Sequence, residues 1–282
     1  MTVDATRTRT RPGTDDVVRR VPLSLVAREL VVEAVEDLSP SLRRVHLTGP
    51  DLLGFASHGP ADHVKVFFPA DDGVLHLPTV SDGRWLDHGD PRFTYRDYTV
   101  RTFDGERLTL DMVVHGHGPA GRWTAAAQPG LSLGVLGPRG SMLPPLDRTH
   151  YLLAADETGL PALLNWLDRL PASARVHAVV EVDSPEHHVD LPALARVDVT
   201  WVYRDGAEPG TTTLLVDAVR TAHEGLRDVP PARRWSWAAA ETSSVRAIRE
   251  LLTADGHDRT SFAMTGYWRR GTANFDHHAP DA

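Results

Sequence analysis

The first half of the chain alternates short apolar runs with breaks rich in Gly and Pro. The runs contain many β-branched and aromatic residues, while the breaks read Ser-Pro, Gly-Pro and Pro-Ala-Asp-Asp-Gly. Irregularly spaced short strands of this kind predict a small antiparallel barrel, not alternating strand–helix units. Six strands are expected: residues 25–35, 42–47, 64–68, the two arms of a hairpin around Asp104-Gly105, and 131–136.

The hairpin is followed by a helix start, and together they form the most informative stretch. Asp104-Gly105 favours the positive φ angles of a type I′ turn, and apolar residues alternate with polar ones from Leu108 to Met112. Gly118-Pro119-Ala120 then begins a helical stretch that extends to Ala127. Pro suits the first helical position, and Gly beside it lets an anion approach the free backbone amides. The stretch therefore suits a ligand with a flat ring at one end and a pyrophosphate at the other.

The pattern changes after Pro144-Pro145, a stiff dipeptide near the expected domain boundary at residue 146. Residues 151–155 form a continuous apolar run, as in a parallel strand buried on both faces. Strand-like and helix-like stretches then alternate, which predicts a doubly wound parallel sheet. Strands are expected at 176–182, 197–203, 235–240 and 262–268, and helices at 160–170, 212–226 and around 245–252, the last with Thr242 or Ser243 as its cap.

Length and composition fit two domains of ordinary size in a globular protein. The chain has 282 residues and a net charge of −8, which argues against nucleic acid as a partner. It has no Cys, which excludes disulfides, Cys-ligated iron–sulfur clusters and thiol catalysis. No apolar run reaches the ~20 residues of a membrane helix, and the N-terminus lacks a signal-peptide pattern. We expect a cytoplasmic monomer without membrane insertion, organised as a flexible leader (1–20), a barrel domain (21–146), an α/β domain (147–275) and a flexible tail (276–282).

Five motifs occur in an order that resembles the siderophore-interacting proteins, FAD-dependent ferric-siderophore reductases of the ferredoxin-reductase-like group. They are Arg96-Asp-Tyr-Thr-Val-Arg101, Asp111-Met-Val-Val-His-Gly116, Gly118-Pro-Ala120 with Trp123, Asp156-Glu-Thr158 with Leu160-Pro-Ala162, and Tyr267-Trp-Arg-Arg-Gly271. The resemblance spans residues 22–271. It implies a six-stranded FAD-binding barrel followed by an NAD(P)H-binding-type α/β domain, with no catalytic side chain beyond the flavin itself.

The resemblance also implies which residues hold the flavin. Tyr98 would lie against the ring or the ribityl chain, Thr99 would bond the ring edge, and Arg96 would neutralise the pyrophosphate. The phosphate-binding helix start and the loop before it would supply Gly118, Pro119, Ala120 and His115. On the adenine side the matching segment contains Asp156, Glu157 and Thr158. Trp268 is expected either to flank the ring or to be a buried core residue, and Trp123 is expected to pack rather than to contact the flavin.

The substrate of the resembled family is an anionic ferric chelate, bound by basic side chains near the exposed flavin edge. Lys65 is the one Lys among the 30 basic residues of this chain, and it matches a Lys of the family. Arg139 matches a second basic position, and Arg269 or Arg270 is the candidate for a third. The expected patch therefore contains Lys65, Arg139 and one of these two arginines.

The electron donor is less well specified than the flavin. The chain lacks Gly-Xaa-Gly-Xaa-Xaa-Gly, and it has Ala155 and Ala240 where relatives often have Gly, so methyl groups could crowd a pyrophosphate. Arg204, or Arg233 with Arg234, is a candidate for a 2′-phosphate that would favour NADPH, although solvated arginines are the simpler interpretation. NAD(P)H and ferredoxin both stay open as donors.

Two further points complete the sequence analysis. Glu186-His-His-Val-Asp190 and Asp276-His-His278 resemble metal-ligand clusters, but their polar loop and tail contexts favour solvated His, and no metal is expected. His115-Gly-His117 is interpreted as part of the flavin loop. The alternatives to a reductase are a non-catalytic flavin or ferric-chelate binding protein and a general NAD(P)H:flavin reductase.

Overall fold

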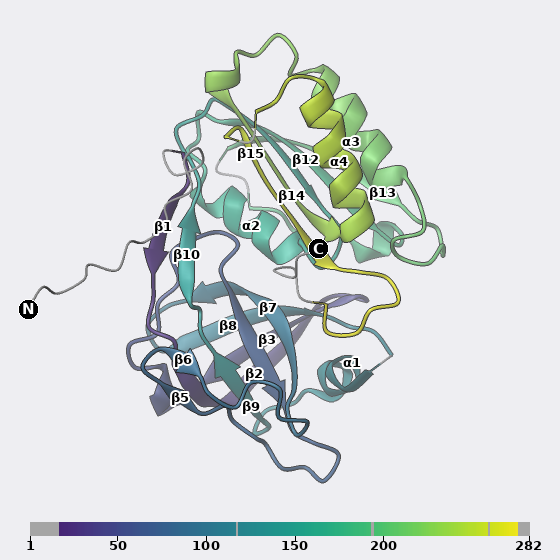
Figure 1. Ribbon diagram of the computed structural model, residues 1–282. Helices are drawn as coiled ribbons and strands as arrows, with labels where there is room; N and C mark the ends of the chain where they lie inside the picture. The colour runs from purple at the N-terminus through teal and green to yellow at the C-terminus, as the bar shows by residue number, and fades with distance from the viewer. Residues whose placement is uncertain (1–16, 117, 193–194, 259, 276–282) are drawn as a thin grey trace, which may run out of the picture.

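The first half of the chain closes into a barrel, as Figure 1 shows. The computed structural model describes residues 17–116, 118–192, 195–258 and 260–275. Six antiparallel strands close in the order β2-β3-β8-β7-β4-β9. Their bounds are β2 (Ala27–Ser39), β3 (Leu42–Thr48), β4 (His63–Phe68), β7 (Thr94–Phe103), β8 (Arg107–Val113) and β9 (Ser132–Leu136). The predicted barrel is confirmed, and the helix α1 (Gly118–Ala126) follows its hairpin as expected.

The second half forms a five-stranded parallel sheet in the order β13-β12-β11-β14-β15. Its strands are β11 (His150–Ala155), β12 (Arg175–Val182), β13 (Arg196–Tyr203), β14 (Arg234–Glu241) and β15 (Phe262–Trp268). The helix α2 (Leu160–Arg169) packs on one face, and α3 (Leu214–Glu224) and α4 (Thr242–Ala254) pack on the other. The predicted doubly wound sheet is therefore confirmed.

Smaller elements were not expected from the sequence. A two-stranded ribbon joins β1 (Arg19–Pro22) to β10 (Gly140–Leu143), and a short hairpin joins β5 (Val80–Ser81) to β6 (Arg84–Trp85). The 3₁₀ turns are η1 (Pro50–Leu52), η2 (Pro185–His187) and η3 (Pro231–Arg233). Residues 1–16 of the expected leader, and the expected tail 276–282, lie outside the described residues.

The hairpin between β7 and β8 forms, but the type I′ turn expected at its tip is wrong. A type I′ turn needs positive φ at both central residues, and here Gly105 has φ of +105° while Asp104 is not among the positive-φ residues. The Asp104 side chain instead accepts hydrogen bonds from the backbone N–H groups of Glu106 and Arg107, at 3.0 and 2.7 Å. This local bonding by Asp holds a longer loop.

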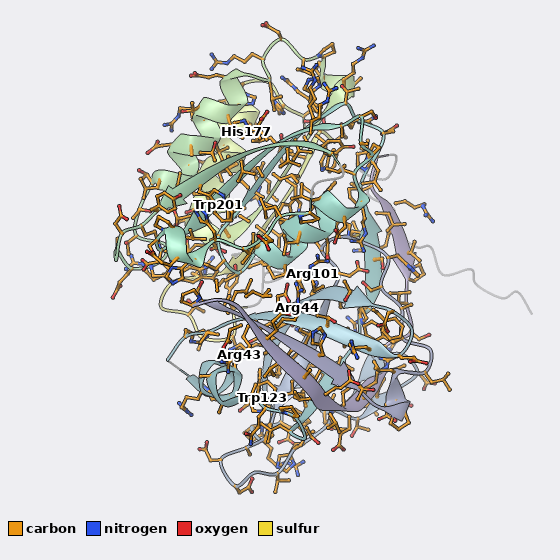
Figure 2. The ribbon with its side chains drawn as sticks, turned by 180° about the vertical axis from the view of Figure 1, so that it is seen from behind. Arg43, Arg44, Arg101, Trp123, His177 and Trp201 are labelled. Carbon is orange, nitrogen blue, oxygen red and sulfur yellow. The ribbon has the colours of Figure 1, made fainter. Side chains whose placement is uncertain are left out.

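The two domains share α2, which is buried between the sheet and the barrel. Asn165 of α2 is completely buried, and its amide donates to the backbone carbonyls of Pro60 and Val100 at 2.9 and 2.8 Å. The guanidinium of Arg101 on β7 donates to the side-chain oxygen Oδ1 of Asn165 at 3.0 Å and to the carboxylate of Asp168 at 2.7 Å. Figure 2 shows Arg101 at the level where the two domains meet. The joint is therefore held by hydrogen bonds between a buried helix and the barrel backbone.

We expect Asn165→Leu to lower the free energy of unfolding by about 2–3 kcal/mol, because buried carbonyls and an Arg donor would lose their partner. Denaturant unfolding followed by circular dichroism measures this change. Asp168→Asn is the matched control: it weakens a partly exposed ion pair of the same Arg101, so its cost should stay below about 1 kcal/mol. Equal costs for the two variants would contradict the role given to Asn165.

Candidate functional site

Three segments supply the expected flavin contacts: β7, the start of α1, and the edge of the parallel sheet where its strands end. On β7, Arg96 is half-buried and its guanidinium donates to the backbone carbonyl of Tyr95 at 2.6 Å. Tyr98 packs against Phe68, with 6.2 Å between ring centroids. Burial raises the pKa of Tyr98 to about 12, opposed by a hydrogen bond with Thr124 of α1, so the phenol stays neutral.

The start of α1 is shaped to accept an anion. Gly118 has φ of +69°, and both Gly116 and Gly118 face open space, so a ligand can reach the backbone. The first turn of α1 contains no acidic residue, so no carboxylate of that turn offsets the positive end of the helix. A Cβ at Gly121 would lie 2.2 Å from the backbone oxygen of His115, so this Gly allows the loop to pack tightly on the helix. Pro119 and Ala120, as expected, belong to the same turn.

Trp123 packs in the barrel domain, with 5.6 Å between its ring centroid and that of Phe68. Packing was the expected role. His117 of the expected flavin loop lies outside the described residues.

The β7 strand also contacts the α/β domain directly. Thr99 is buried, and its side chain hydrogen-bonds Tyr267 of β15. Burial raises the pKa of Tyr267 to about 12, with the Thr99 hydrogen bond opposing it and nearby Asp156 and Asp62 adding to it. The residue expected at the ring edge of the flavin therefore lies where the barrel meets the end of the sheet.

Asp156 connects the strands at that edge. Its Oδ1 accepts hydrogen bonds from the N–H and hydroxyl of Thr158 at 2.8 and 2.6 Å and from the N–H of Gly159 at 3.3 Å. Its Oδ2 accepts from the backbone N–H of Glu241 at 3.0 Å and from Nε1 of Trp268 at 2.7 Å. Burial, and then the charge of Glu157, raises the pKa of Asp156 to about 6. Asp156 thus accepts from both Thr158 and Trp268 and links the ends of β11, β14 and β15.

Arg204 is buried beside the same edge. It donates to both carboxylate oxygens of Glu157 at 2.5 and 3.0 Å and to Glu181 at 3.4 Å. Arg234 is also buried, and its guanidinium donates to the carbonyl of Leu226 at 2.9 Å. The interpretation as solvated is wrong for these two arginines, whereas Arg233 is exposed. The carboxylates that pair with Arg204, and the position of Arg234 at the start of β14, do not favour a 2′-phosphate site, which stays a prediction.

The cap of α4 also differs from the expectation. Thr242 or Ser243 was expected there, but the N-cap is Glu241, whose carboxylate accepts from the backbone N–H of Ser243 at 2.5 Å and from its hydroxyl. Its other oxygen accepts from the backbone N–H of Arg270 at 3.2 Å. Burial raises the pKa of Glu241, but the hydrogen bonds from Ser243 hold it below its ordinary value, so the group is ionised at neutral pH.

The expected chelate-binding residues come from both domains. Lys65 of β4 pairs with Asp97, with its Nζ 2.8 and 3.1 Å from the carboxylate oxygens, and lies over the Tyr95 ring at 5.2 Å. Arg139 is exposed in the turn between β9 and β10. Arg269 lies over the Phe275 ring at 4.9 Å, and Arg270 is exposed. Lys65 pairs in register with Leu136, the last residue of β9, and Arg139 follows three positions later.

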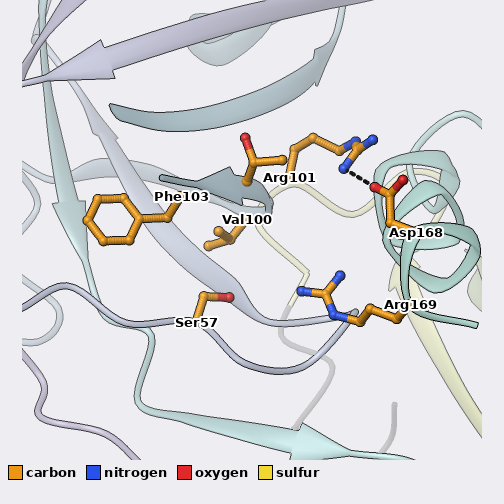
Figure 3. Close-up of a pocket in the computed structure, with 7 residues that line it drawn as sticks. Ser57, Val100, Arg101, Phe103, Asp168 and Arg169 are labelled. Atoms are coloured by element: carbon orange, nitrogen blue, oxygen red, sulfur yellow. Dashed lines mark hydrogen bonds and ion pairs between the residues drawn. The ribbon is translucent and has the colours of Figure 1, made fainter. Parts of the chain in front are cut away.

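A cavity of about 280 Å³ lies at the domain joint (Figure 3). It is lined by Ser57, Val100, Arg101, Thr102, Phe103, Asp168 and Arg169. The dashed ion pair in Figure 3 joins Arg101 to Asp168. None of the expected flavin contacts lines this cavity, so we assign it to the joint.

The loop histidines have structural partners. His188 is half-buried and stacked on Trp201 at 4.0 Å, and its Nε2 is 3.0 Å from the Tyr203 hydroxyl, so it is not the solvated residue that was expected. Within the described ranges no group of three or more His, Asp or Glu side chains could hold a metal ion, and residues 276–278 lie outside them. None of the helices there has the length and apolar character needed to cross a bilayer.

Sequence reasoning missed several contacts of the site. Tyr267 was part of a quoted motif without a role, and Thr124 was not assigned to any contact. Glu241 was placed at the ligand-binding edge of the sheet, but its role as the cap of α4 was not predicted. One signal was available for the joint: Asn165 interrupts an apolar helix, and a polar residue in such a place usually has buried partners. The partners themselves come from distant segments and left no local signal.

Comparison with known proteins identifies the group to which this architecture belongs. Residues 31–142 match the siderophore-interacting FAD-binding domain, and residues 148–271 match the siderophore-interacting protein domain. The NADPH-dependent ferric-chelate reductase of Escherichia coli is 34% identical over 255 residues, which cover 89% of this chain and 96% of the relative. This chain belongs to the siderophore-interacting protein family.

Other members of the siderophore-interacting protein family agree in sequence and structure. The ferric vibriobactin reductase ViuB of Vibrio cholerae is 31% identical over 86% of this chain and 89% of its own length. A siderophore utilization protein from T. fusca superposes with a TM-score of 0.88 at 44% identity, covering 93% of this chain and all of that one. A ferredoxin NADP+ reductase from Neisseria gonorrhoeae, at 14% identity and a TM-score of 0.58, shares the fold.

The raised pKa of Asp156 predicts how stability depends on pH. The folded value is about 6 and the unfolded value is about 3.9, so the folded state binds the proton more tightly. The stabilisation that Asp156 contributes to the folded state is fully present below the pKa of the unfolded state. It is lost as the pH rises through the pKa of the folded state. We expect the unfolding free energy of the wild type, relative to Asp156→Asn, to fall by about 2–3 kcal/mol between about pH 4 and pH 7. Urea unfolding of both proteins across this pH range measures the change. A difference in unfolding free energy that does not vary with pH would contradict the raised pKa of Asp156.

Proposed function

We propose that this protein is an FAD-dependent ferric-siderophore reductase that releases iron by reducing chelated Fe(III) to Fe(II) with electrons from NAD(P)H. The observation that carries the proposal is the open, acid-free N-terminus of α1 beside the β7 strand that contains Arg96, Tyr98 and Thr99. A pyrophosphate fits the helix end, and a flat ring fits the neighbouring strand. The named activities of the relatives from Escherichia coli and Vibrio cholerae support the same reaction.

The residues of the barrel domain would hold FAD by complementary chemistry. The backbone N–H groups that begin at Gly118 would bind the pyrophosphate, and Arg96 would neutralise its charge. Tyr98, kept neutral by burial, offers an aromatic face and a hydroxyl already fixed by Thr124. When bound, the flavin supplies the conversion between two-electron and one-electron transfer. The chain itself binds, orients and shields, and no side chain acts as a general acid or base.

The adenine side and the domain division follow the same proposal. Asp156, Glu157 and Thr158 would form the adenine side, and Trp268, whose indole donates to Asp156, would flank the ring. The barrel domain (21–146) would bind FAD, and the α/β domain (147–275) would receive the donor. The cytoplasmic location, the monomeric state and ferredoxin as an alternative donor stay predictions.

The ferric chelate would bind near Lys65 and Arg139, with Arg269 or Arg270 from the other domain. Positive side chains attract an anionic chelate and hold it while one electron reaches each Fe(III). Hard oxygen donors hold Fe(II) far less tightly than Fe(III), so reduction releases the metal. One hydride carries two electrons, so two ferric ions are reduced for each nicotinamide oxidised.

A spectroscopic titration tests the reaction. The purified protein should be yellow, should be bleached by NADPH without oxygen, and should recover its colour when a ferric chelate is added, with Fe(II) trapped by ferrozine. A protein that binds FAD but is not reoxidised by ferric chelates would instead be a non-catalytic binder. Release of free reduced flavin on turnover would favour a general flavin reductase.

Charge reversal tests the substrate patch. We expect Lys65→Glu with Arg139→Glu to raise the KM for an anionic ferric chelate by about tenfold or more, because attraction becomes repulsion, and to leave the FAD content unchanged. The control is Arg246→Glu on the exposed side of α4, which changes charge in the same sense. Loss of FAD from the double variant, or an equal effect in the control, would reject the patch.

A further inference from the structure

The four α-helices in the described part of the chain differ in the charge at their N-termini. The first turn of α1 contains no acidic residue. Neither does the first turn of α2. The other two helices of the α/β domain each have a carboxylate at their start: Asp217 lies in the first turn of α3, and Glu241 caps α4. Free N–H groups at a helix start favour the binding of a pyrophosphate, and a carboxylate at the same place opposes it.

Glu241 blocks α4 by charge and by contact. Its carboxylate binds the backbone N–H of Ser243, which is the group that a phosphate oxygen would otherwise bind. The loop after β13 closes over it, because a Cβ at Gly210 would lie only 2.7 Å from Cγ of Glu241 and 3.1 Å from the Trp268 ring. The position is therefore filled by the chain's own anion.

The surrounding charges strengthen the exclusion. Four acidic side chains are buried at this edge: Asp156, Glu157, Glu181 and Glu241. Arg204 pairs with two of them, Glu157 and Glu181. An incoming pyrophosphate would carry two negative charges towards this group. Repulsion between like charges opposes binding more strongly in a buried site than in water.

Resting on the proposed function, we propose that Glu241 is a donor-specificity residue: its carboxylate occupies the α4 N-terminus and weakens the binding of a nicotinamide dinucleotide at the end of the sheet. The nicotinamide donor then docks without a pyrophosphate contact to α4. The FAD site on the barrel is unaffected, because its pyrophosphate position belongs to α1.

Steady-state kinetics of the FAD-loaded protein with NADPH test the proposal. Glu241→Gln removes the charge and keeps a side chain that can cap the helix, and Glu241→Ser also clears volume while keeping a capping hydroxyl. We expect both variants to lower the KM for NADPH by about three- to tenfold, since they remove a repulsive negative charge from the positive end of the helix. The FAD content and the KM for the ferric chelate should not change.

Glu250→Gln is the matched control, because Glu250 is an exposed residue of the same helix and the net charge changes equally. A KM for NADPH that falls with the Glu241 variants and not with Glu250→Gln supports the proposal. An unchanged KM overturns it. A raised KM also overturns it, and would make Glu241 a group that binds the donor.

Failure of the proposed function gives a different result. Flavin reduced with dithionite, after removal of excess reductant, should still be reoxidised by a ferric chelate in wild type and variants, whatever the donor. If NADPH does not reduce the wild type at all, the proposal predicts a measurable rate in Glu241→Gln, and no gain there would reject it. Absence of chelate-dependent reoxidation in every protein would reject the reductase function instead.

Discussion

The structure depends on a helix that lies between the two domains. α2 is buried by the sheet on one side and by the barrel on the other, and Asn165 is the polar group that makes this burial acceptable. Its amide satisfies two barrel carbonyls, and its own oxygen accepts from Arg101. Because an unsatisfied buried polar group is costly, this arrangement fixes how the domains face each other. The proposed site between the domains depends on that fixed relation.

A single carboxylate organises the edge of the sheet. Asp156 binds the start of α2, the end of β14 and the indole of Trp268, so residues from three strand ends are held together. Burial and the charge of Glu157 raise the pKa of this carboxyl group, while hydrogen bonds from Thr158 and Trp268 oppose the rise. Five donors in all bind its two oxygens. The first turn of α1 contains no acidic residue, whereas a carboxylate caps α4, so the ends of these two helices differ in charge.

Sequence reasoning predicted the elements well and the contacts poorly. The alternation from Leu108 to Met112 and the continuous run 151–155 report local burial, so the strands and the two architectures could be read directly. The turn at Asp104 was wrong because propensity gave the residue type but not the partner of its side chain. Arg204 was expected to be solvated because its carboxylate partners lie 47 and 23 positions away in the chain.

The sequence by itself determined the order of strands and helices, the acid-free start at Gly118-Pro119 and the family motifs, because these depend on residues close together in the chain. Tertiary structure alone decided that Thr99 meets Tyr267, that Asp156 bonds Trp268 and that Glu241 lies under Gly210. These contacts join residues far apart in sequence, and only the packing of two domains around α2 brings them within bonding distance.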